Sequence, residues 1–356
     1  MHKRYIDEMG EFIQTHSCLL ASGGKSKTAL RTPEGVTNLD LSGMSGVLDY
    51  EPSEYTFTAL AGTPLKEVEQ MLSANDQFLP FDPPLNQAGG TLGGTVAAGL
   101  SGPGRYRFGG IRDFVLGVRY LDGRGNLIRS GGKVVKNAAG FDIPKLMVGS
   151  LGSLGALVEL SFKVFPKPED YTTITSSYTS LGSALERLIN LTVSPIEIIC
   201  LDLEPVSNGY NLQVRLGGKH TLFNSRIERL KSELGDISIM DNNVESEYWQ
   251  QINEFDWIQE GSTLVKVPIT PKQVSDLDNF LSEHGSIRRY SVGANIAWIA
   301  WSKQLDILED HFKESNLAGL TILGVTSQSH IGDWKSGIFS QRIKQALDPN
   351  GKWALV

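Results

Sequence analysis

The stretch "GGTLGGTVAAGLSGPGRYRFGG", residues 89–110, decides how this sequence is interpreted. It holds nine glycines in twenty-two positions and contains no histidine, cysteine or carboxylate. Glycine loses more conformational freedom on folding than any other residue, so this density indicates a local need for bare backbone. One explanation is a large ligand that is bound mainly by main-chain groups. The alternative is a glycine-rich loop that packs closely against a sheet.

The composition is that of a soluble globular protein. The chain has 356 residues, of which 40% are hydrophobic and 21% charged, enough for two domains or for one large domain with an insertion. The net charge of −7 argues against a general nucleic-acid binder. The first residues lack the apolar core of a signal peptide, and no run of about 18 apolar residues occurs. We therefore expect a cytoplasmic protein, with peripheral attachment to the inner membrane through a complex left open.

The number and spacing of the cysteines also favour a cytoplasmic protein. There are two cysteines, Cys18 and Cys200, and no C-x-x-C motif. This pattern argues against an iron–sulfur cluster or a structural zinc site held by this chain, and it fits a reducing compartment.

The texture of the sequence changes near "FPKPED" (165–170), where two prolines and three charges interrupt both helix and strand. We predict a first domain over 1–168 and a second over 169–335. Residues 336–356 form a C-terminal segment, for which a return to the first domain stays open.

Within the first domain the sequence predicts a buried strand that runs into a glycine turn over 18–27. It also predicts a helix that starts after "AGTP" (61–64), capped by Thr63 with Pro64 in its first position and with one apolar face. A hairpin is predicted over 113–132, where apolar alternation surrounds a "DGRG" turn.

The second domain shows a weak internal repeat. Two successive β-α-β-β-α-β units can be drawn, with helices over 180–192, 220–234, 271–283 and 303–315. Two such units can place their strands in one antiparallel sheet with helices on one face. The predicted class is therefore α+β, with the second domain as a lid.

The segment "ASGGKSK" (21–27) places Gly23 and Gly24 directly after a strand. Glycines there allow consecutive N–H groups to converge on an anion such as a pyrophosphate, and Lys25 and Lys27 add positive charge. A plain glycine hairpin is the alternative. Neither a P-loop nor a G-x-G-x-x-G motif can be drawn there, so a Rossmann site is not supported.

A third segment, "GGKVVKNAAGFDIPKLMVGSLGSLGALVE" (131–159), is again rich in glycine. From Arg105 to Lys136 the chain carries eight basic and two acidic residues, a local excess in an acidic protein. This excess predicts a site for phosphates, an anionic substrate or an acidic partner. A solvated basic face is the equal alternative.

The order of these segments resembles the vanillyl-alcohol-oxidase (PCMH) type FAD-binding domain. Within that group the chain is most similar to the family of second, smaller flavin-binding subunits of bacterial glycolate oxidase (glycolate dehydrogenase). The resemblance is continuous over about 18–168, weaker over the lid domain, and visible again in "IKQALDPNG" (343–351). The segment "VVKNAAGFD" (134–142) is its most specific part. The chain has "KWALV" (352–356) where the family has asparagine–proline–glycine–arginine, which leaves a C-terminal contact with the flavin domain open.

The resemblance implies FAD bound without a covalent link, since no histidine or cysteine lies in 22–27, where some relatives attach the flavin. By position, it implies three groups of contacts. The pyrophosphate group comprises Ser22, Gly23, Gly24, Lys25 and Ser26; the isoalloxazine and ribityl group comprises Pro83, Gly90, Thr91, Gly93, Gly94, Thr95, Ala98 and Gly99; the adenine group comprises Gly149, Gly152, Gly155 and Val158. We expect Arg105, Lys136 and Asn137 near the reactive edge of the flavin, where positive charge would stabilise the anionic reduced ring. For each of these three, a structural ion pair or an exposed side chain is the alternative.

Catalytic relatives carry clustered histidines in the lid domain, but the six histidines here lie at least ten positions apart. No catalytic base is therefore nominated, and no metal site is predicted. The resemblance implies a larger FAD-containing subunit and an iron–sulfur subunit as partners, with this flavin relaying electrons from the oxidation of glycolate to glyoxylate. Two alternatives stay open: a stand-alone FAD-dependent dehydrogenase of a small 2-hydroxy acid such as D-lactate, and a non-catalytic scaffold subunit.

Overall fold

The computed structural model describes residues 2–30, 33–132, 142–326, 328–334 and 337–355. The chain divides into two compact units. Unit 1 comprises the residues up to Ser101, Gly109–Lys167 and the described residues after Trp334. Unit 2 comprises Gly102–Phe108 and Pro168–Trp334. The short segment Gly102–Phe108, which belongs to the glycine-rich stretch, thus packs with the strands of the second unit.

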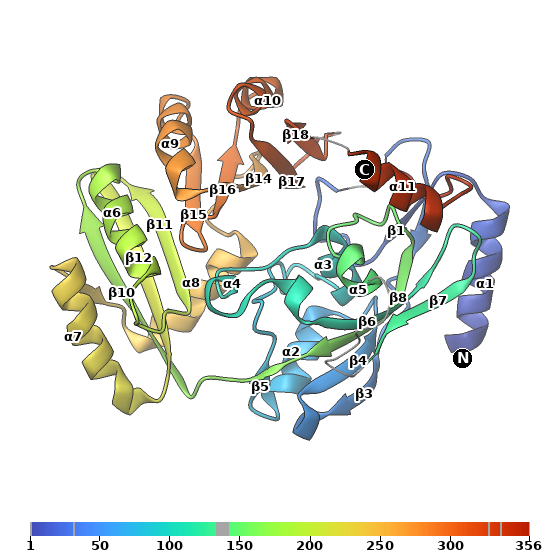
Figure 1. Ribbon diagram of the computed structural model, residues 1–356, viewed down its shortest axis with the longest axis horizontal. Helices are drawn as coiled ribbons and strands as arrows, with labels where there is room; N and C mark the ends of the chain where they lie inside the picture. Colours follow the sequence, from blue (N-terminus) through green and yellow to red (C-terminus); the bar gives the residue numbers. More distant parts are fainter. Residues whose placement is uncertain (1, 31–32, 133–141, 327, 335–336, 356) are drawn as a thin grey trace. The chain divides into compact units, whose positions relative to one another are not determined.

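Unit 1 is built on a five-stranded antiparallel sheet in the order β3-β4-β8-β6-β7 (Figure 1). A parallel pair, β1 and β2, and a short antiparallel pair, β5 and β9, complete its strands in the described residues. The strands are β1 (Leu19–Ser22), β2 (Thr37–Asp40), β3 (Val47–Glu51), β4 (Thr56–Leu60), β5 (Gln77–Phe78), β6 (Val115–Leu121), β7 (Leu127–Gly131), β8 (Ala156–Lys163) and β9 (Phe165–Pro166). The helices are α1 (His2–Thr15), α2 (Leu65–Ser73), α3 (Leu92–Ala98), α5 (Ile143–Met147) and α11 (Ile338–Leu347).

The predicted hairpin is confirmed as β6 and β7. Its turn is held by Asp122, whose Oδ1 accepts hydrogen bonds from the backbone N–H groups of Arg124 and Asn126 at 2.8 and 2.9 Å. Gly125 takes a positive φ of 76°, which a β-carbon would strain. The two strands pair from Gly117 with Gly131 to Leu121 with Leu127.

The predicted helix after "AGTP" is confirmed as α2, but its predicted cap is wrong. The residue before the helix is Pro64, with an extended ψ of 139° and no side-chain cap. The hydroxyl of Thr63 instead bonds to Gly46, accepting from its N–H at 3.0 Å and donating to its carbonyl at 3.2 Å. The Thr63 hydroxyl, which the local sequence pattern assigned to the helix N-terminus, therefore bonds to a loop that is distant in sequence. The predicted apolar face is present and buried: Leu65, Val68 and Leu72.

Strand β1 is covered on both edges. Its residues Leu19 to Ser22 pair in parallel with Thr37 to Asp40 of β2. On the other edge, the N–H of Leu19 bonds to the carbonyl of Lys352, and the carbonyl of Leu19 accepts from the N–H of Ala354. The C-terminal segment therefore contributes directly to the strand that leads into the glycine turn.

Two lysines fasten this C-terminal segment. Lys344 Nζ donates to the carbonyls of Ser153 and Trp353, both at 2.6 Å, and forms an ion pair with the buried Asp348. Lys352 Nζ donates to the carbonyl of His16 at 2.6 Å. The Trp353 side chain is only 2% exposed and packs with the apolar side chains of α1 and β1.

Unit 2 is a nine-stranded antiparallel sheet in the order β13-β10-β12-β11-β15-β16-β14-β17-β18. The two predicted β-α-β-β-α-β units are confirmed in this order; α8 and β18 are additions that the repeat did not predict. The strands are β10 (Asp170–Tyr178), β11 (Cys200–Val206), β12 (Gly209–Gly218), β13 (Ser238–Ile239), β14 (Thr263–Pro268), β15 (Ile287–Ser291), β16 (Ile296–Trp301), β17 (Ala318–Leu323) and β18 (His330–Gly332). The helices are α4 (Arg105–Phe108), α6 (Leu181–Thr192), α7 (Phe223–Leu234), α8 (Asn242–Glu254), α9 (Val274–Glu283) and α10 (Leu305–Glu314).

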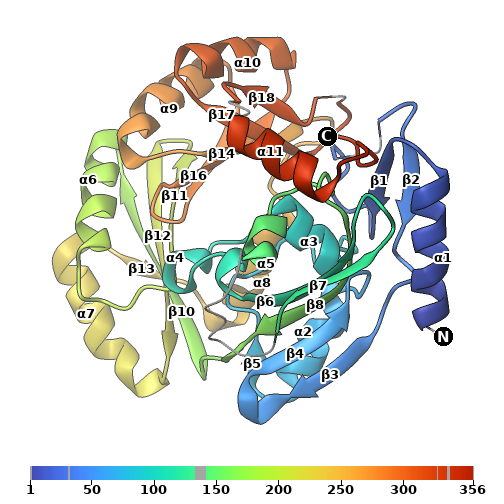
Figure 2. The same cartoon turned by 45° about the vertical axis from the view of Figure 1, so that its right-hand side comes forward.

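The two faces of this sheet differ in chemistry. Helices α6, α7, α9 and α10 lie along one face (Figure 2), and alternate strand residues such as Ile174, Val214 and Ile299 form an apolar core with them. The intervening residues point to the opposite face, where β10, β11, β12 and β15 carry polar and charged side chains that α8 partly covers. Over β14 and β16 the same face carries the buried apolar residues Leu264, Trp298 and Ala300. None of the described helices combines the length and the apolar composition that spanning a bilayer requires.

Candidate functional site

The turn that follows β1 has no room for side chains. A β-carbon on Gly24 would lie 1.9 Å from the carbonyl oxygen of Gly89, and one on Gly23 would lie 2.6 Å from Thr91 Oγ1. Lys25 then takes a left-handed φ of 53°. The two glycine-rich segments of the sequence therefore meet here by close backbone approach, which only glycine permits.

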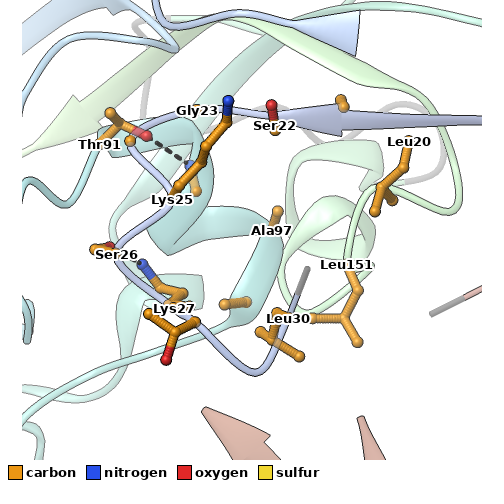
Figure 3. Close-up of a pocket in the computed structure, with 15 residues that line it drawn as sticks. Leu20, Ser22, Gly23, Lys25, Ser26, Lys27, Leu30, Thr91, Ala97 and Leu151 are labelled. Carbon is orange, nitrogen blue, oxygen red and sulfur yellow. Dashed lines mark hydrogen bonds between the residues drawn. The ribbon is translucent and has the colours of Figure 1, made fainter. Parts of the chain in front are cut away.

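A cavity of about 470 Å³ lies beside this turn (Figure 3). Its walls come from β1, the turn, helix α3 and the segment around Leu151. The lining residues are Leu20, Ala21, Ser22, Gly23, Gly24, Lys25, Ser26, Lys27, Thr28, Leu30, Thr91, Gly94, Ala97, Ala98 and Leu151. A smaller cavity of about 50 Å³ shares Ser22, Gly23, Thr91 and Gly94 and adds Gly93, Gly152 and Gly155.

The wall of the large cavity offers polar groups that the protein leaves unused. The buried Oγ of Ser22 has no hydrogen-bond partner. Among the residues that the structure describes, no acceptor takes the backbone N–H groups of residues 23–26. The Ser22 hydroxyl is the buried group among them, and a buried polar group without a partner is costly; Gly24 and Lys25 are exposed, so their N–H groups are open to a ligand that accepts hydrogen bonds.

Helix α3 supplies the opposite wall. Thr91 precedes it, and its Oγ1 accepts from the N–H of Gly94 at 3.3 Å, while Thr95 Oγ1 donates to the carbonyl of Thr91 at 2.9 Å. The helix ends at Gly99, which takes a left-handed φ of 62°. The small residues Gly94, Ala97 and Ala98 leave the volume beside this helix open.

The two lysines of the turn are in different environments. Lys25 is exposed and pairs with Asp40, with an Nζ–Oδ2 distance of 3.3 Å. Lys27 is 9% exposed and lines the cavity, and its Nζ donates to Ser26 Oγ at 3.3 Å. Burial lowers the pKa of Lys27 to about 8. The buried amine of this wall is therefore that of Lys27, which the sequence pattern identified only as added charge.

The structure brings together part of the predicted cofactor set. Eight of the predicted residues line the large cavity: Ser22, Gly23, Gly24, Lys25, Ser26, Thr91, Gly94 and Ala98. Three more line the small cavity: Gly93, Gly152 and Gly155. The cavity also includes residues that sequence reasoning did not nominate: Leu20, Ala21, Lys27, Thr28, Leu30, Ala97 and Leu151. Lys27 lies in an irregular turn, where no periodic pattern in the sequence distinguishes it from Lys25.

The remaining predicted residues of unit 1 that the structure describes lie outside these two cavities and contribute to packing. Gly90 accepts from the N–H of Leu65 and donates to the carbonyl of Leu85. A β-carbon on Gly99 would meet the backbone of Gly149 at 3.1 Å, so these two glycines let α3 approach the following turn. The others are buried between backbone segments: Pro83, Thr95 and Val158. Contact of these residues with a cofactor stays a prediction.

The basic stretch is divided between the units. Arg105 lies in unit 2 near Lys266 of β14, where burial and, to a smaller extent, the charge of Arg105 lower the pKa of Lys266 to about 8. Arg107 pairs with Glu197 at 2.7 Å, and Arg119 of unit 1 pairs with Glu159. Lys136 and Asn137 lie outside the described residues. Part of the basic excess is therefore used in ion pairs within the protein.

The histidines do not form a metal site in the described part of the chain, where no three metal-ligating side chains gather. Two of them, distant in sequence, do come together: His311 stacks on Phe280 with ring centroids 3.7 Å apart, and His284 contacts the same ring in a tilted arrangement at 4.4 Å. His220 pairs with Asp170, and His16 stacks on Phe12. These contacts are those of structural residues.

The polar face of the unit 2 sheet holds a buried charge network. Arg289, 2% exposed, donates to Asp202 at 2.9 Å and also pairs with Glu204. Nearby, Arg215 makes two parallel hydrogen bonds to Glu245 of α8, at 2.8 and 2.9 Å. Helix α8 is thus held on this face by ionic contacts as well as by packing.

Replacing Arg289 tests this network. In Arg289→Met the carboxylates of Asp202 and Glu204 lose their buried partner, and we expect unit 2 to lose about 3–5 kcal/mol of stability. Urea unfolding followed by circular dichroism measures the change. Arg187→Met, at an exposed position of α6, is the control, and equal stability of both variants would contradict the assignment.

Comparison with known proteins defines the class. Residues 7–131 match the family model of the FAD binding domain. Solved structures of alkyldihydroxyacetonephosphate synthase share the fold: one has a TM-score of 0.69 over 97% of this chain and 73% of that chain, at 15% identity. The first part of the chain is therefore an FAD-binding domain, in a fold that these solved structures share.

Three relatives narrow the class. The glycolate oxidase subunit GlcE of Escherichia coli (strain K12) is 36% identical over 249 residues, which cover 70% of this chain and 67% of the relative. The chain belongs to the FAD-binding family of this subunit. The glycolate oxidase subunit GlcD of Bacillus subtilis (strain 168) is 29% identical over 163 residues, and a D-lactate dehydrogenase of Anaerostipes hadrus is 29% identical over 151 residues. These matches cover 46% and 42% of this chain and about a third of each relative.

Proposed function

We propose that this chain is the FAD-binding subunit of a multi-subunit glycolate oxidase, an oxidoreductase that acts on the CH–OH group of a 2-hydroxy acid. The observation that carries the proposal is the large cavity, where Ser22 Oγ and the N–H groups of residues 23–26 line one wall and have no partner among the described residues. These donors match the chemistry of a diphosphate, which offers only acceptors and negative charge.

The residues present fit the cofactor. The turn 23–26 would hold the diphosphate by its amides and by Ser22, and Gly94, Ala97 and Ala98 would leave room along α3 for the rest of the molecule. When bound, FAD supplies an acceptor and donor of electrons, which this chain's side chains cannot provide. Among the described residues that line the cavity there is no histidine or cysteine to which a flavin could be linked.

We further propose a division of labour with partners. Oxidation of glycolate to glyoxylate needs a base for the hydroxyl proton, and we assign this role to no residue of this chain. A larger FAD-containing subunit would oxidise glycolate, an iron–sulfur subunit would carry the electrons onward, and this flavin would relay them. Two relatives with the names of different glycolate oxidase subunits support this assembly.

The proposed function predicts that the purified protein carries noncovalent FAD. Acid precipitation should release the yellow chromophore into the supernatant, where its absorbance and mass identify it. Colour that remains with the precipitate would contradict noncovalent binding. Colourless protein that also fails to bind added FAD would overturn the proposed function.

A further inference from the structure

Lys27 is a buried ammonium in the wall of the large cavity, and no carboxylate pairs with it in the described part of the chain. We propose that Lys27 is the cation that neutralises the diphosphate of FAD, and that cofactor binding moves a proton from solvent onto its amine. This inference rests on the proposed function, because it assumes that the cavity holds FAD.

The position of the amine supports this role. Lys27 Nζ lies 3.3 Å from Ser26 Oγ and 4.0 Å from the point where a β-carbon on Gly94 would stand. It is therefore between the turn and α3, the two walls that would enclose the diphosphate. Figure 3 shows the two lysine side chains of the turn extending in different directions.

No other titratable group competes with Lys27 among the described residues that line the cavity, except Lys25. Lys25 is exposed, and its amine is engaged by Asp40. Strand β1, helix α3 and residues 148–155 contribute no titratable side chain. The charge that an incoming anion meets at this wall is thus that of Lys27.

Burial makes the ammonium costly before the cofactor arrives. It lowers the pKa of Lys27 to about 8 in the free protein, because the charged form loses its hydration. A bound diphosphate favours the charged form and raises this pKa again. Binding therefore takes up a proton above about pH 8, and the affinity for FAD falls as the pH rises through that value.

The test measures the dissociation constant of FAD for the apoprotein at pH 7 and pH 9. We expect about tenfold weaker binding at pH 9, because the protonated fraction of Lys27 in the free protein falls about tenfold between pH 7 and pH 9. Calorimetry at pH 8.5, in two buffers with different ionisation enthalpies, counts the proton that is taken up. Both measurements report binding and need no enzyme activity.

Variants separate this role from a structural one. In Lys27→Met we expect binding at pH 7 to weaken by about tenfold to a hundredfold, because a charge-assisted contact is lost. The pH dependence should disappear, and the unfolding temperature of the apoprotein should rise, because a buried charge without a partner is removed. Lys25→Met should keep the pH dependence, and Lys66→Met, exposed on α2, is the matched control.

Two results would overturn the inference. One is FAD binding by the wild type that is independent of pH, together with unchanged affinity in Lys27→Met. The other is a Lys27→Met apoprotein that is less stable than the wild type, which would indicate a structural lysine. A wild-type protein that binds no FAD at any pH is a different failure, because it removes the proposed function itself.

Discussion

The variant Gly94→Val should lose FAD while keeping its fold. We expect the affinity to fall by at least about a hundredfold, which corresponds to about 3 kcal/mol. Gly94 lies in the first turn of α3, and a β-carbon there would contact only side-chain atoms, Thr91 Oγ1 at 3.1 Å and Lys27 Nζ at 4.0 Å. The helix can therefore accept the substitution, whereas the two methyl groups would occupy the cavity.

The measurement is FAD content per chain after gel filtration, together with the dissociation constant for added FAD. Gly182→Val is the matched control, because Gly182 is an exposed residue of α6 and, outside its chain neighbours and the backbone of its own helix, no atom of the described residues lies within 4 Å of the position that its β-carbon would take. Thermal unfolding of both apoproteins shows whether the fold is retained. Wild-type flavin content in Gly94→Val would show that the glycine segment serves packing alone.

The second large effect concerns the reaction. The isolated chain, fully loaded with FAD, should reduce its flavin with glycolate or D-lactate at least about a hundredfold more slowly than the assembled complex. General-base catalysis accelerates such a reaction by about 10²–10⁴-fold, and we assign no residue of this chain as the base. His311 is engaged in stacking on Phe280, and His284 packs against the same ring at a tilt.

Anaerobic mixing with the substrate, followed by the absorbance of the oxidised flavin, measures this rate. Chemical reduction of the same sample is the control that the flavin is accessible. Rapid bleaching by the isolated chain would contradict the relay and favour a stand-alone dehydrogenase. A slow rate that rises when the partner subunits are added is the expected result.

Much of the fold could be predicted because its elements carry local signals. The hairpin of β6 and β7 is indicated by its turn, and the apolar face of α2 by the spacing of Leu65, Val68 and Leu72. The two β-α-β-β-α-β repeats of unit 2 could be predicted because the spacing of apolar residues alternates between that of a strand and that of a helix. The prediction that Thr63 caps α2 was wrong because a contact distant in sequence decides its role. The Thr63 hydroxyl bonds to Gly46, seventeen positions away, and not to the helix that follows it.

The site was predictable in its location but less so in its detail. The density of glycines indicated where two backbone segments approach each other closely. The close approach of Gly24 to the carbonyl of Gly89, which leaves no room for a β-carbon, gives the reason. It did not separate glycines beside a cavity, such as Gly94, from those that pack segments together, such as Gly99. An irregular loop has no period, so the sequence could not say that Lys27 is buried while Lys25 is exposed.

The pairing of β1 with residues 352–354 links cofactor binding to the time course of synthesis. The contact between Lys352 and His16 joins positions 336 residues apart. On the ribosome, β1 and its glycine turn emerge before α11, and one edge of the strand stays open until residues 352–354 have been translated. FAD is therefore expected to bind only after these residues have emerged, and a nascent chain halted before α11 should bind it poorly.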